Sequence, residues 1–326
     1  PSPQVYAIAQ DRRGHLWVGT ERGVATFDGE TFTIYDAADG LAGDEVLSIC
    51  EDVDGNLWFG TLDDGVSRFD GTTFTNFDRD DGLVGSRVRA IMQVADGDMW
   101  LGTGSGVSRY DGRRFSSLTI EDGLVSNDIS TMHQANDGSI WLGTGRLLGL
   151  VGGGGISRWD GAEFHNYTIA DGLPSERILD IHEDDNANLW FATGQGVTRW
   201  DGTSFHHIGA GTPLSEGEVY AIARDLDGQL WFAMGSVWSF TGRGVARWDG
   251  QDFATFTTRD GLGGDRVLSA FADNEGYLWF GARQGGLTRY DGGRFASFSQ
   301  AEGLPSDDVR DIAEDAERGR IYLPAE

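Results

Sequence analysis

The sequence predicts an all-β fold, a seven-bladed β-propeller of four-stranded antiparallel blades, and three observations support this prediction. First, tryptophans recur at spacings of 41, 42, 41, 49, 41 and 48 residues, close to the length of one four-stranded blade. Second, each repeat holds four short runs rich in Val, Ile, Phe, Trp and Thr, separated by Gly and Asp. Third, no stretch shows the apolar spacing of a long helix. Each recurring tryptophan follows Leu, Met or Ile and stands two residues before Gly or Ala; the seven are Trp17, Trp58, Trp100, Trp141, Trp190, Trp231 and Trp279.

The second repeat shows how each strand is recognised. Strand A (46–51) ends at an acidic turn, and strand B (57–61) contains the tryptophan. Strand C (65–69) has the run Gly-Val-Ser-Arg-aromatic, and strand D (74–77) has the pattern Phe-x-x-aromatic. Asp-Gly between C and D favours a tight hairpin, because both residues tolerate positive φ. In an up-and-down sheet the B–C turns and the long D–A connections share one face, which we call the top face.

Residues 1–308 hold seven repeats, and residues 309–326 begin an eighth. Ile321-Tyr322-Leu323 takes the place of Leu-Trp-Phe in that eighth repeat, so we predict an extra A–B hairpin at the C-terminal end. Pro1 aligns with Pro174, in the middle of a connection between repeats. We therefore interpret the chain as a piece of a longer repeat array.

The composition is strongly acidic. The chain has 52 Asp and Glu against 25 basic residues, all of them Arg, for a formal net charge of −27. This charge argues against binding to nucleic acid, whose phosphates require a basic surface, and against binding to anionic membranes. No apolar run of about 20 residues is present, so no membrane span is expected in this segment. The single cysteine, Cys50, cannot form an intrachain disulfide and is predicted to be a small buried side chain.

The residue just before each strand A alternates in charge from the second repeat onward. If these residues lie side by side, Glu45–Arg87 and Asp128–Arg177 should form ion pairs near 4 Å. Chance is the alternative explanation. The alternation along this eight-member series also keeps an arrangement of eight blade positions open. The series is Gln4, Glu45, Arg87, Asp128, Arg177, Glu218, Arg266 and Asp308.

The sequence shows no catalytic constellation, and we expect neither a metal nor a cofactor. Gly-x-Ser-x-Gly, the phosphate-binding Gly-x-x-x-x-Gly-Lys-Ser/Thr and His-Glu-x-x-His are all missing. His133 and His182 share one strand-A position in adjacent repeats, which suggests either a metal pair or, more simply, packing. Residues 184–188 alternate oxygen ligands but lack the Gly and the distal Glu of a calcium loop, which favours an A–B turn.

Departures from the repeat indicate where a binding site could lie, because packing keeps the rest of each unit uniform. Insertions lengthen two B–C turns, at residues 145–155 (the blade-4 insert) and 235–244 (the blade-6 insert). Between them, the connection at 209–214 has lost its Asp-Gly-Leu. All three departures are predicted to lie on the top face.

We predict a ligand site on that face. Trp238 and Phe240 of the blade-6 insert have no place in the repeat, and aromatic faces of this kind stack on sugar rings. Arg146 and Arg243 can donate to hydroxyls or carboxylates. Three further side chains in the second position of strand A are expected to complete the floor: Tyr6, Arg89 and Tyr220. In the alternative, the inserts fold back on each other or dock a neighbouring domain.

Residues 56–61 (Asn-Leu-Trp-Phe-Gly-Thr), 65–69 (Gly-Val-Ser-Arg-Phe) and 81–83 (Asp-Gly-Leu) resemble the two-component regulator propeller repeat. The resemblance covers residues 1–326. It implies a periplasmic or extracellular ligand-sensing segment of a membrane-anchored histidine kinase, often a hybrid one that responds to glycans. The implied partners are a small-molecule or glycan ligand and further repeats or signalling domains of the parent chain.

Two other functions stay open. The chain has a weaker likeness to streptogramin lyase propellers, whose units also carry Asp-Gly-x-x-Trp-Phe, and this leaves a metal-dependent lyase or hydrolase as an alternative. Such an activity needs His and acidic groups on one face, and the sequence shows no clear matching set. The third possibility is a scaffold for protein–protein contact.

Overall fold

The computed structural model describes residues 5–28, 31–145, 153–209, 211–215, 217–236, 242–273, 276–302, 307–309, 313–315 and 320–322. It contains seven four-stranded antiparallel sheets and a two-stranded one, so the chain is a seven-bladed β-propeller with an additional hairpin, as predicted. We number the blades 1–7 in chain order and call their strands A to D. The chain forms two compact units, Pro1–Thr168 and Ile169–Glu326.

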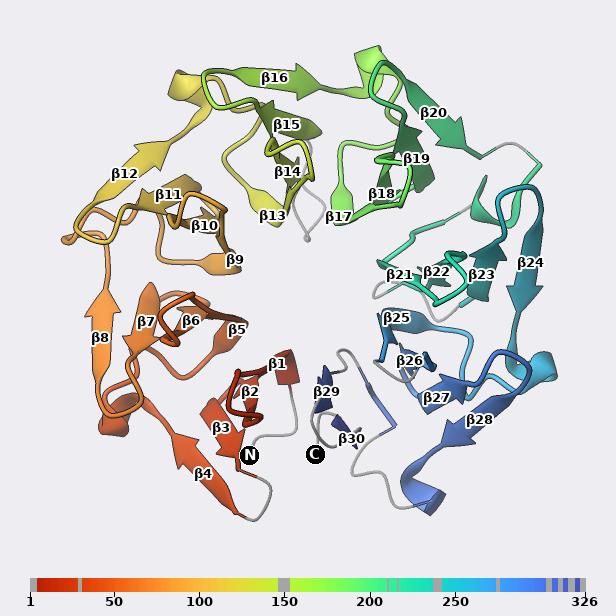
Figure 1. Ribbon diagram of the computed structural model, residues 1–326, viewed down its shortest axis with the longest axis horizontal. Coiled ribbons are helices and arrows are strands. Elements are labelled where there is room, and N and C mark those ends of the chain that lie inside the picture. Colours follow the sequence, from red (N-terminus) through yellow and green to blue (C-terminus); the bar gives the residue numbers. More distant parts are fainter. Residues whose placement is uncertain are drawn as a thin grey trace. The chain divides into compact units, whose positions relative to one another are not determined.

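The first unit holds blades 1–4. In each blade the strands pair in chain order, and the A strands of consecutive blades contact one another (Figure 1). The strands are β1 (Val5–Gln10), β2 (Leu16–Thr20), β3 (Gly23–Phe27), β4 (Phe32–Tyr35), β5 (Val46–Glu51), β6 (Leu57–Thr61), β7 (Val66–Phe69), β8 (Phe74–Phe77), β9 (Val88–Gln93), β10 (Met99–Thr103), β11 (Gly106–Tyr110), β12 (Phe115–Leu118), β13 (Ile129–Gln134), β14 (Ile140–Thr144), β15 (Ile156–Trp159) and β16 (Phe164–Tyr167).

The second unit holds blades 5–7 with the same strand order, followed by the predicted A–B hairpin, which is formed by β29 and β30. The strands are β17 (Ile178–Glu183), β18 (Leu189–Thr193), β19 (Gly196–Trp200), β20 (Phe205–Ile208), β21 (Ala221–Arg224), β22 (Leu230–Met234), β23 (Gly244–Trp248), β24 (Phe253–Phe256), β25 (Val267–Ala272), β26 (Leu278–Ala282), β27 (Gly286–Tyr290), β28 (Phe295–Phe298), β29 (Ala313–Asp315) and β30 (Arg320–Tyr322).

Six of the D–A connections contain a short 3-10 helix, and the connection after blade 2 contains turns instead. The Asp-Gly-Leu signature explains η1, η2 and η5, because its Asp closes a capping box at the helix start and its Gly ends the helix in a left-handed conformation. In the connection after blade 3, the Thr119 side chain accepts from Glu121 N, and Gly123 has φ 108°. The helices are η1 (Ala37–Asp39), η2 (Ile120–Asp122), η3 (Ile169–Asp171), η4 (Pro213–Ser215), η5 (Thr258–Asp260) and η6 (Gln300–Glu302).

The recurring tryptophans pack neighbouring blades together, as the sequence predicts. Trp17 of blade 1 lies 5.4 Å from Phe59 of blade 2, and Trp231 of blade 6 lies 4.8 Å from Tyr290 of blade 7, both between ring centroids. Trp58 is fully buried. Cys50 packs against the same apolar cluster as Trp58, as predicted, but it is only partly buried.

Most A–B strand pairs contain a β-bulge near the start of strand A. In blade 2, Val46 pairs with Thr61 and Ser48 with Gly60, so one A-strand residue is left without a partner across the strand. The same register shift occurs in blades 1, 3, 4, 5 and 7. A bulge changes the direction of the residue that it leaves out of pairing. It therefore acts on the second strand-A position, which Tyr6 and Arg89 occupy in blades 1 and 3. The third predicted residue, Tyr220, lies just before β21 in blade 6, whose A–B pairing shows no such shift.

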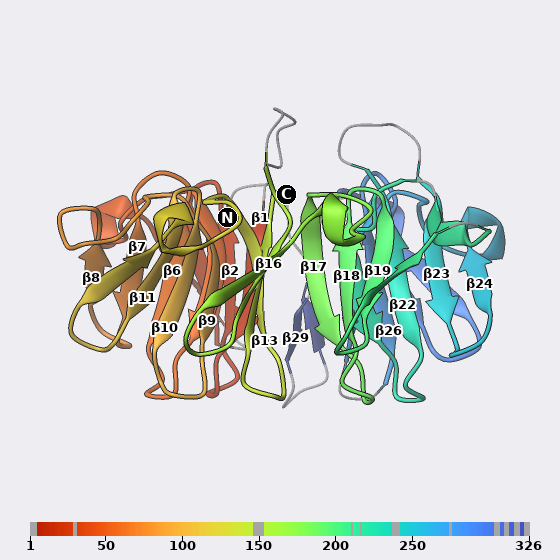
Figure 2. The ribbon, with the colours of Figure 1, turned by 90° about the horizontal axis from the view of Figure 1, so that it is seen from above.

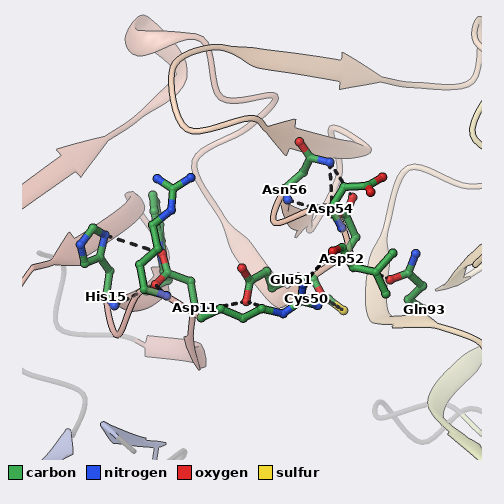
Figure 3. A network of polar contacts seen from close by, with 12 residues as sticks. Asp11, His15, Cys50, Glu51, Asp52, Asp54, Asn56 and Gln93 are labelled. Carbon is green, nitrogen blue, oxygen red and sulfur yellow. Dashed lines mark hydrogen bonds and ion pairs between the residues drawn. The ribbon is translucent and has the colours of Figure 1, made fainter. Parts of the chain in front are cut away.

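Different hydrogen bonds are formed at the two ends of the strands. At one end, the B–C turn bonds to the residue before strand A of its own blade, as in Leu62 N to Glu45 O at 2.9 Å. This bond confirms that B–C turns and D–A connections share one end. The A–B turns lie at the other end (Figure 2). There Gln93 Oε1 accepts from Val53 N of the preceding blade at 2.6 Å (Figure 3).

Candidate functional site

Tyr6 and Arg89, two of the predicted site residues, occupy bulge positions in the first unit. Both side chains reach the residue that precedes strand A of the next blade. Tyr6 Oη donates to Glu45 Oε1 at 2.9 Å, and Arg89 Nη1 forms an ion pair with Asp128 Oδ1. The Arg89 and Asp128 side chains are only 22% and 14% exposed, so the pair is partly shielded from water. These contacts fix both predicted residues at the top face.

Tyr220, the corresponding residue of blade 6, belongs to a three-residue polar group in the second unit. Its Oη donates to Glu218 Oε2 at 3.1 Å, while Arg177 Nη2 donates to Glu218 Oε1 at 2.5 Å and lies 3.5 Å from Tyr220 Oη. Arg177 and Glu218 precede the A strands of blades 5 and 6 and are neighbours in the alternating charge series. Here the predicted pairing of neighbouring charges occurs, and the phenol ring of Tyr220 is fixed beside it.

The prediction of a Glu45–Arg87 ion pair is wrong. Arg87 instead donates through Nε to Leu62 O at 3.3 Å and pairs through Nη2 with Asp63 at 3.2 Å, both in the B–C turn of blade 2. A B–C turn exposes a carbonyl oxygen at this point, and the planar guanidinium can bind it and a nearby carboxylate together. Glu45 accepts from Tyr6. The charge alternation in the sequence did not reveal that the B–C turn of blade 2 offers Arg87 other partners than Glu45.

Asp128 and Arg177, the other predicted pair, belong to different units. Their proximity therefore stays a prediction. Within its own unit Asp128 pairs with Arg89, and within its own unit Arg177 pairs with Glu218.

Trp238, Phe240 and Arg146, the predicted ligand contacts in the two inserts, lie outside the described residues. The first residues of the blade-6 insert are held in place, because Arg266 donates to Ser236 O through Nη2 at 2.8 Å and through Nε at 3.2 Å.

Arg243, at the far end of the blade-6 insert, is exposed. Its backbone N–H donates to Met234 O at 3.1 Å. Its Nη1 lies 3.9 Å from the position that a Cβ on Gly217 would take. Gly217 directly precedes Glu218, so the structure brings the predicted donor Arg243 to the same connection as Tyr220.

A pocket of about 720 Å³ lies beside the altered connection after blade 5. Pro213 and Ile208 form part of one wall, and Trp248 and Phe253 of blade 6 face them, with Gln251 and Asp252 as polar neighbours. Sequence reasoning identified this connection but missed the blade-6 residues, since an aromatic stands at the Trp248 position in every repeat.

The pocket lies where a recurring bond between blades is missing. In four places, the backbone N–H after the connection's Leu donates to a buried hydroxyl on strand C of the next blade, at 2.8–3.0 Å. Blade 6 has Ala246 at that position, and Ser215 N bonds within its own connection to Thr212 O at 3.2 Å. The connection after blade 5 therefore lacks this bond to the neighbouring blade. The hydroxyl-bearing residues elsewhere are Ser67, Ser108, Ser157 and Thr288.

Strand β17 carries a carboxyl group in an unusual environment. Asp180 accepts from Ile181 N at 2.8 Å and from Ile222 N of the next blade at 2.9 Å. The residue keeps some exposed surface, but protein atoms enclose its carboxyl, and this desolvation raises its pKa to about 6 although both N–H donors favour the charged form. Sequence analysis did not single out Asp180, although it is a departure from the repeat: the corresponding positions hold Ala, Ser or Thr.

The remaining sequence candidates lie in a turn and in two A strands. Residues 184–188 form an A–B turn, in which Asp184 N donates to Asn188 O at 2.9 Å, as predicted. His133 lies on β13 in the first unit and His182 on β17 in the second.

Comparisons with known proteins agree with the repeat reading. The family model described as two component regulator propeller matches residues 1–22, 40–63, 82–105 and 123–146. Each of the last three segments runs from a D–A connection to the B–C turn, and so includes the top-face residues. No curated protein sequence matches the chain.

Solved structures share the fold at low sequence identity. The extracellular domain of a hybrid two component system from B. thetaiotaomicron has TM-score 0.68 and 19% identity, with 99% of this chain and 50% of that chain covered. PorZ, a surface component of the type-IX secretion system of Porphyromonas gingivalis, has TM-score 0.68 and 17% identity, with 100% and 54% covered. Virginiamycin B lyase from Staphylococcus aureus has TM-score 0.60 and 15% identity, with 85% and 91% covered. The chain thus spans about half the length of the first two, and these likenesses concern the fold alone.

No helix in the part of the chain that the structure describes has the length and apolar character to cross a bilayer.

Proposed function

Since this chain carries two-component regulator propeller repeats, we propose that it is an extracytoplasmic ligand-binding sensor module within a longer, membrane-anchored signalling protein. The observation that carries the proposal is that the two insertions and the altered connection fall in blades 4, 5 and 6, while the other complete repeats keep the regular length and the Asp-Gly-Leu or Glu-Gly-Leu of their connections. A sensor needs one distinctive surface on an otherwise rigid scaffold, and binding residues are commonly presented by loops on such scaffolds.

The chemistry of the top face in the second unit supports recognition of a polar small molecule, and we propose a saccharide. Tyr220 offers an aromatic face, and the exposed Arg243 offers several N–H donors near Gly217. The Arg177–Glu218 pair supplies fixed polar atoms beside them. Aromatic faces with fixed donors suit sugar rings and their hydroxyls. We propose binding rather than turnover because three carboxylates that precede A strands on the top face, Glu45, Asp128 and Glu218, are each bound to a Tyr or Arg.

A glycan array probed with the purified chain tests the function, and two variants locate the site. Arg243→Ala removes the exposed donor of the top face. Trp248→Ala removes the aromatic wall of the pocket, and Trp200→Ala is its matched control, because both tryptophans pair with the strand-B Leu of their own blade.

We expect Arg243→Ala to weaken binding at least about tenfold, the loss of one well-placed polar contact. An effect of Trp248→Ala without an effect of Trp200→Ala would move the site to the pocket. Failure of the folded chain to bind any glycan would contradict a saccharide sensor. Binding that all three variants retain would remove both locations.

A further inference from the structure

The hairpin between β15 and β16 gathers three side chains that can bind a metal. Asp160 Oδ2 lies 2.8 Å from His165 Nε2, and one ligand atom each from Asp160, Glu163 and His165 lies within 4.8 Å of the other two. Among the residues that the structure describes, this is the one group of three or more His, Cys, Asp or Glu with that geometry. It lies apart from the top-face residues, since C–D hairpins are at the opposite end of the strands from B–C turns.

The local sequence explains the geometry. Asp160 Oδ1 accepts from Ala162 N at 2.9 Å and from Glu163 N at 3.0 Å, which fixes the carboxylate and leaves Oδ2 for His165. Residues 163 and 165 point the same way in an extended chain, and Phe164 between them packs on Trp159, with ring centroids 4.8 Å apart.

The cation on the neighbouring strand is bound elsewhere. Arg158 pairs with His165 across the strands, but its guanidinium stacks over Trp141 at 5.5 Å and donates to Asp137 at 3.1 Å. The group of three therefore carries two negative charges and an imidazole at the surface of a strongly acidic protein. Its side chains are accessible: His165 is 42% and Asp160 34% exposed.

Other C–D hairpins share the Asp but not the full group. The hairpin of blade 5 comes nearest, with His206 Nε2 at 2.6 Å from Asp201 Oδ2, but Ser204 stands where blade 4 has Glu163. The residue three positions after the hairpin Asp differs between the blades: in blades 1–7 it is, in order, Thr, Thr, Arg, Glu, Ser, Asp and Arg. The residue five positions after that Asp is His only in blades 4 and 5. Blade 4 alone combines a carboxylate there with the His.

We propose that Asp160, Glu163 and His165 form a surface site for a divalent transition-metal ion of the zinc class. Imidazole with carboxylate oxygens suits Zn²⁺, whereas Mg²⁺ and Ca²⁺ take oxygen ligands alone. Three protein ligands leave at least one coordination position of a tetrahedral ion for water or for a ligand from another molecule. The site is independent of the proposed sensor function, because it uses no top-face residue.

Isothermal titration of untagged, chelator-stripped protein with ZnCl₂ tests the proposal. We expect one equivalent to bind, and Glu163→Ser, which gives blade 4 the hairpin chemistry of blade 5, to weaken binding at least about tenfold, in line with losses seen when metal-site residues are altered. The reciprocal variant Ser204→Glu should add a second equivalent, because Asp201 and His206 already approach each other. Co²⁺ in place of Zn²⁺ should give a visible spectrum that Glu163→Ser diminishes.

Both variants change surface positions, so far-ultraviolet circular dichroism should match the parent protein. Equal Zn²⁺ binding by the parent and Glu163→Ser, or no binding by the parent, would overturn the proposal. A Ser204→Glu variant that folds but gains no equivalent would contradict the claim that a carboxylate at this position completes the site.

Discussion

The recurring tryptophans depend on one polar bond as well as on packing. In five blades the indole Nε1 donates to the Asp that starts the A–B turn, at 2.7–3.0 Å (Asp11 and Asp52 in Figure 3). Blade 4 has Ala135 at that place, and Trp141 bonds to Ser139 Oγ at 2.9 Å instead. Blade 3 has Val94, and Trp100 Nε1 is buried without a hydrogen-bond partner. A buried unsatisfied donor is costly, so blade 3 contains a defect that the other blades lack.

Val94→Asp should therefore stabilise the protein, although it places a charged residue at a buried position. The turn backbone is already suitable, because Val94 N donates to Asp98 O at 3.0 Å just as Asp52 N donates to Asn56 O at 2.9 Å. We expect the free energy of unfolding to rise by about 1 kcal/mol, the value of a typical hydrogen bond, in chemical denaturation.

Ala135→Asp is the matched control for that variant. It makes a similar change at a similarly buried turn, but Trp141 already has Ser139 as its acceptor. It should give no gain. Stabilisation by both variants alike would show that the effect is not due to the Trp100 indole.

Asp180 predicts a pH dependence whose sign differs from that of most carboxylates. Its folded-state pKa is about 6, above the ordinary Asp value of about 3.9. Between those values the folded state holds a proton that the unfolded state has released, so this group lowers stability as pH rises from about 4 to about 6. The loss is on the order of 2–3 kcal/mol and persists above pH 6.

Asp180→Asn should remove this pH-dependent loss of stability. The variant should be more stable than the parent protein at pH 8 by about 1–3 kcal/mol, and the difference should shrink towards pH 4. Urea titrations of both proteins across that range measure it, and effects of all other carboxylates cancel in the difference. A difference that does not change with pH would contradict the raised pKa.

At the level of strands and turns, sequence reasoning reached most of the fold. The Leu-Trp-Phe and Gly-Val-Ser-Arg runs predicted strands B and C because their burial pattern repeats in every unit. The A-strand bulge was not predictable, since the Val-x-x-Ile pattern looks the same with or without an extra unpaired residue. The bulge directs Tyr6 and Arg89 towards the next blade, so the sequence located these residues but not their partners Glu45 and Asp128.

The hydrogen bond between a D–A connection and strand C of the next blade can be tested by making the same Thr→Val substitution at two positions. Thr288→Val removes the hydroxyl that accepts from Gly263 N at 2.9 Å. Thr198→Val makes the same change in blade 5, where the connection offers Pro174, which has no N–H, and Thr198 Oγ1 is buried without a partner. Both side chains are buried.

We expect Thr288→Val to cost about 1–3 kcal/mol, because it leaves the partly buried N–H of Gly263 unsatisfied. Thr198→Val should be neutral or stabilising, because it removes an unsatisfied hydroxyl of nearly the same shape. Thermal unfolding of the two variants beside the parent protein is sufficient. Equal destabilisation would indicate that the hydroxyl contributes through packing and not through the bond to the connection.

For the whole molecule, the dominant electrostatic feature is excess negative charge. The sequence pI is about 4.4, and 52 acidic side chains face 25 basic ones. Carboxylates that lie at turns, such as Asp70, are kept ionised because bonds from Thr72 and Thr73 hold its pKa well below the usual range. Like charges at this density repel across the surface, and folding brings them closer together. The ion pairs that are present, such as Arg87–Asp63, are exposed and contribute little individually.

The stabilisation by ion pairs and the repulsion between like charges respond to salt in opposite directions. Their relative magnitudes predict how salt changes the melting temperature. Salt weakens the exposed ion pairs, each worth about 0.2–1 kcal/mol, but it also screens repulsion among a net charge of −27, which acts over many more pairs. The melting temperature should therefore rise when NaCl is increased from about 10 mM to about 300 mM, where the Debye length falls from about 30 Å to below 8 Å. Sucrose at matched osmolality controls for general solvent exclusion. A melting temperature that falls over this range would mean that the ion pairs outweigh the repulsion.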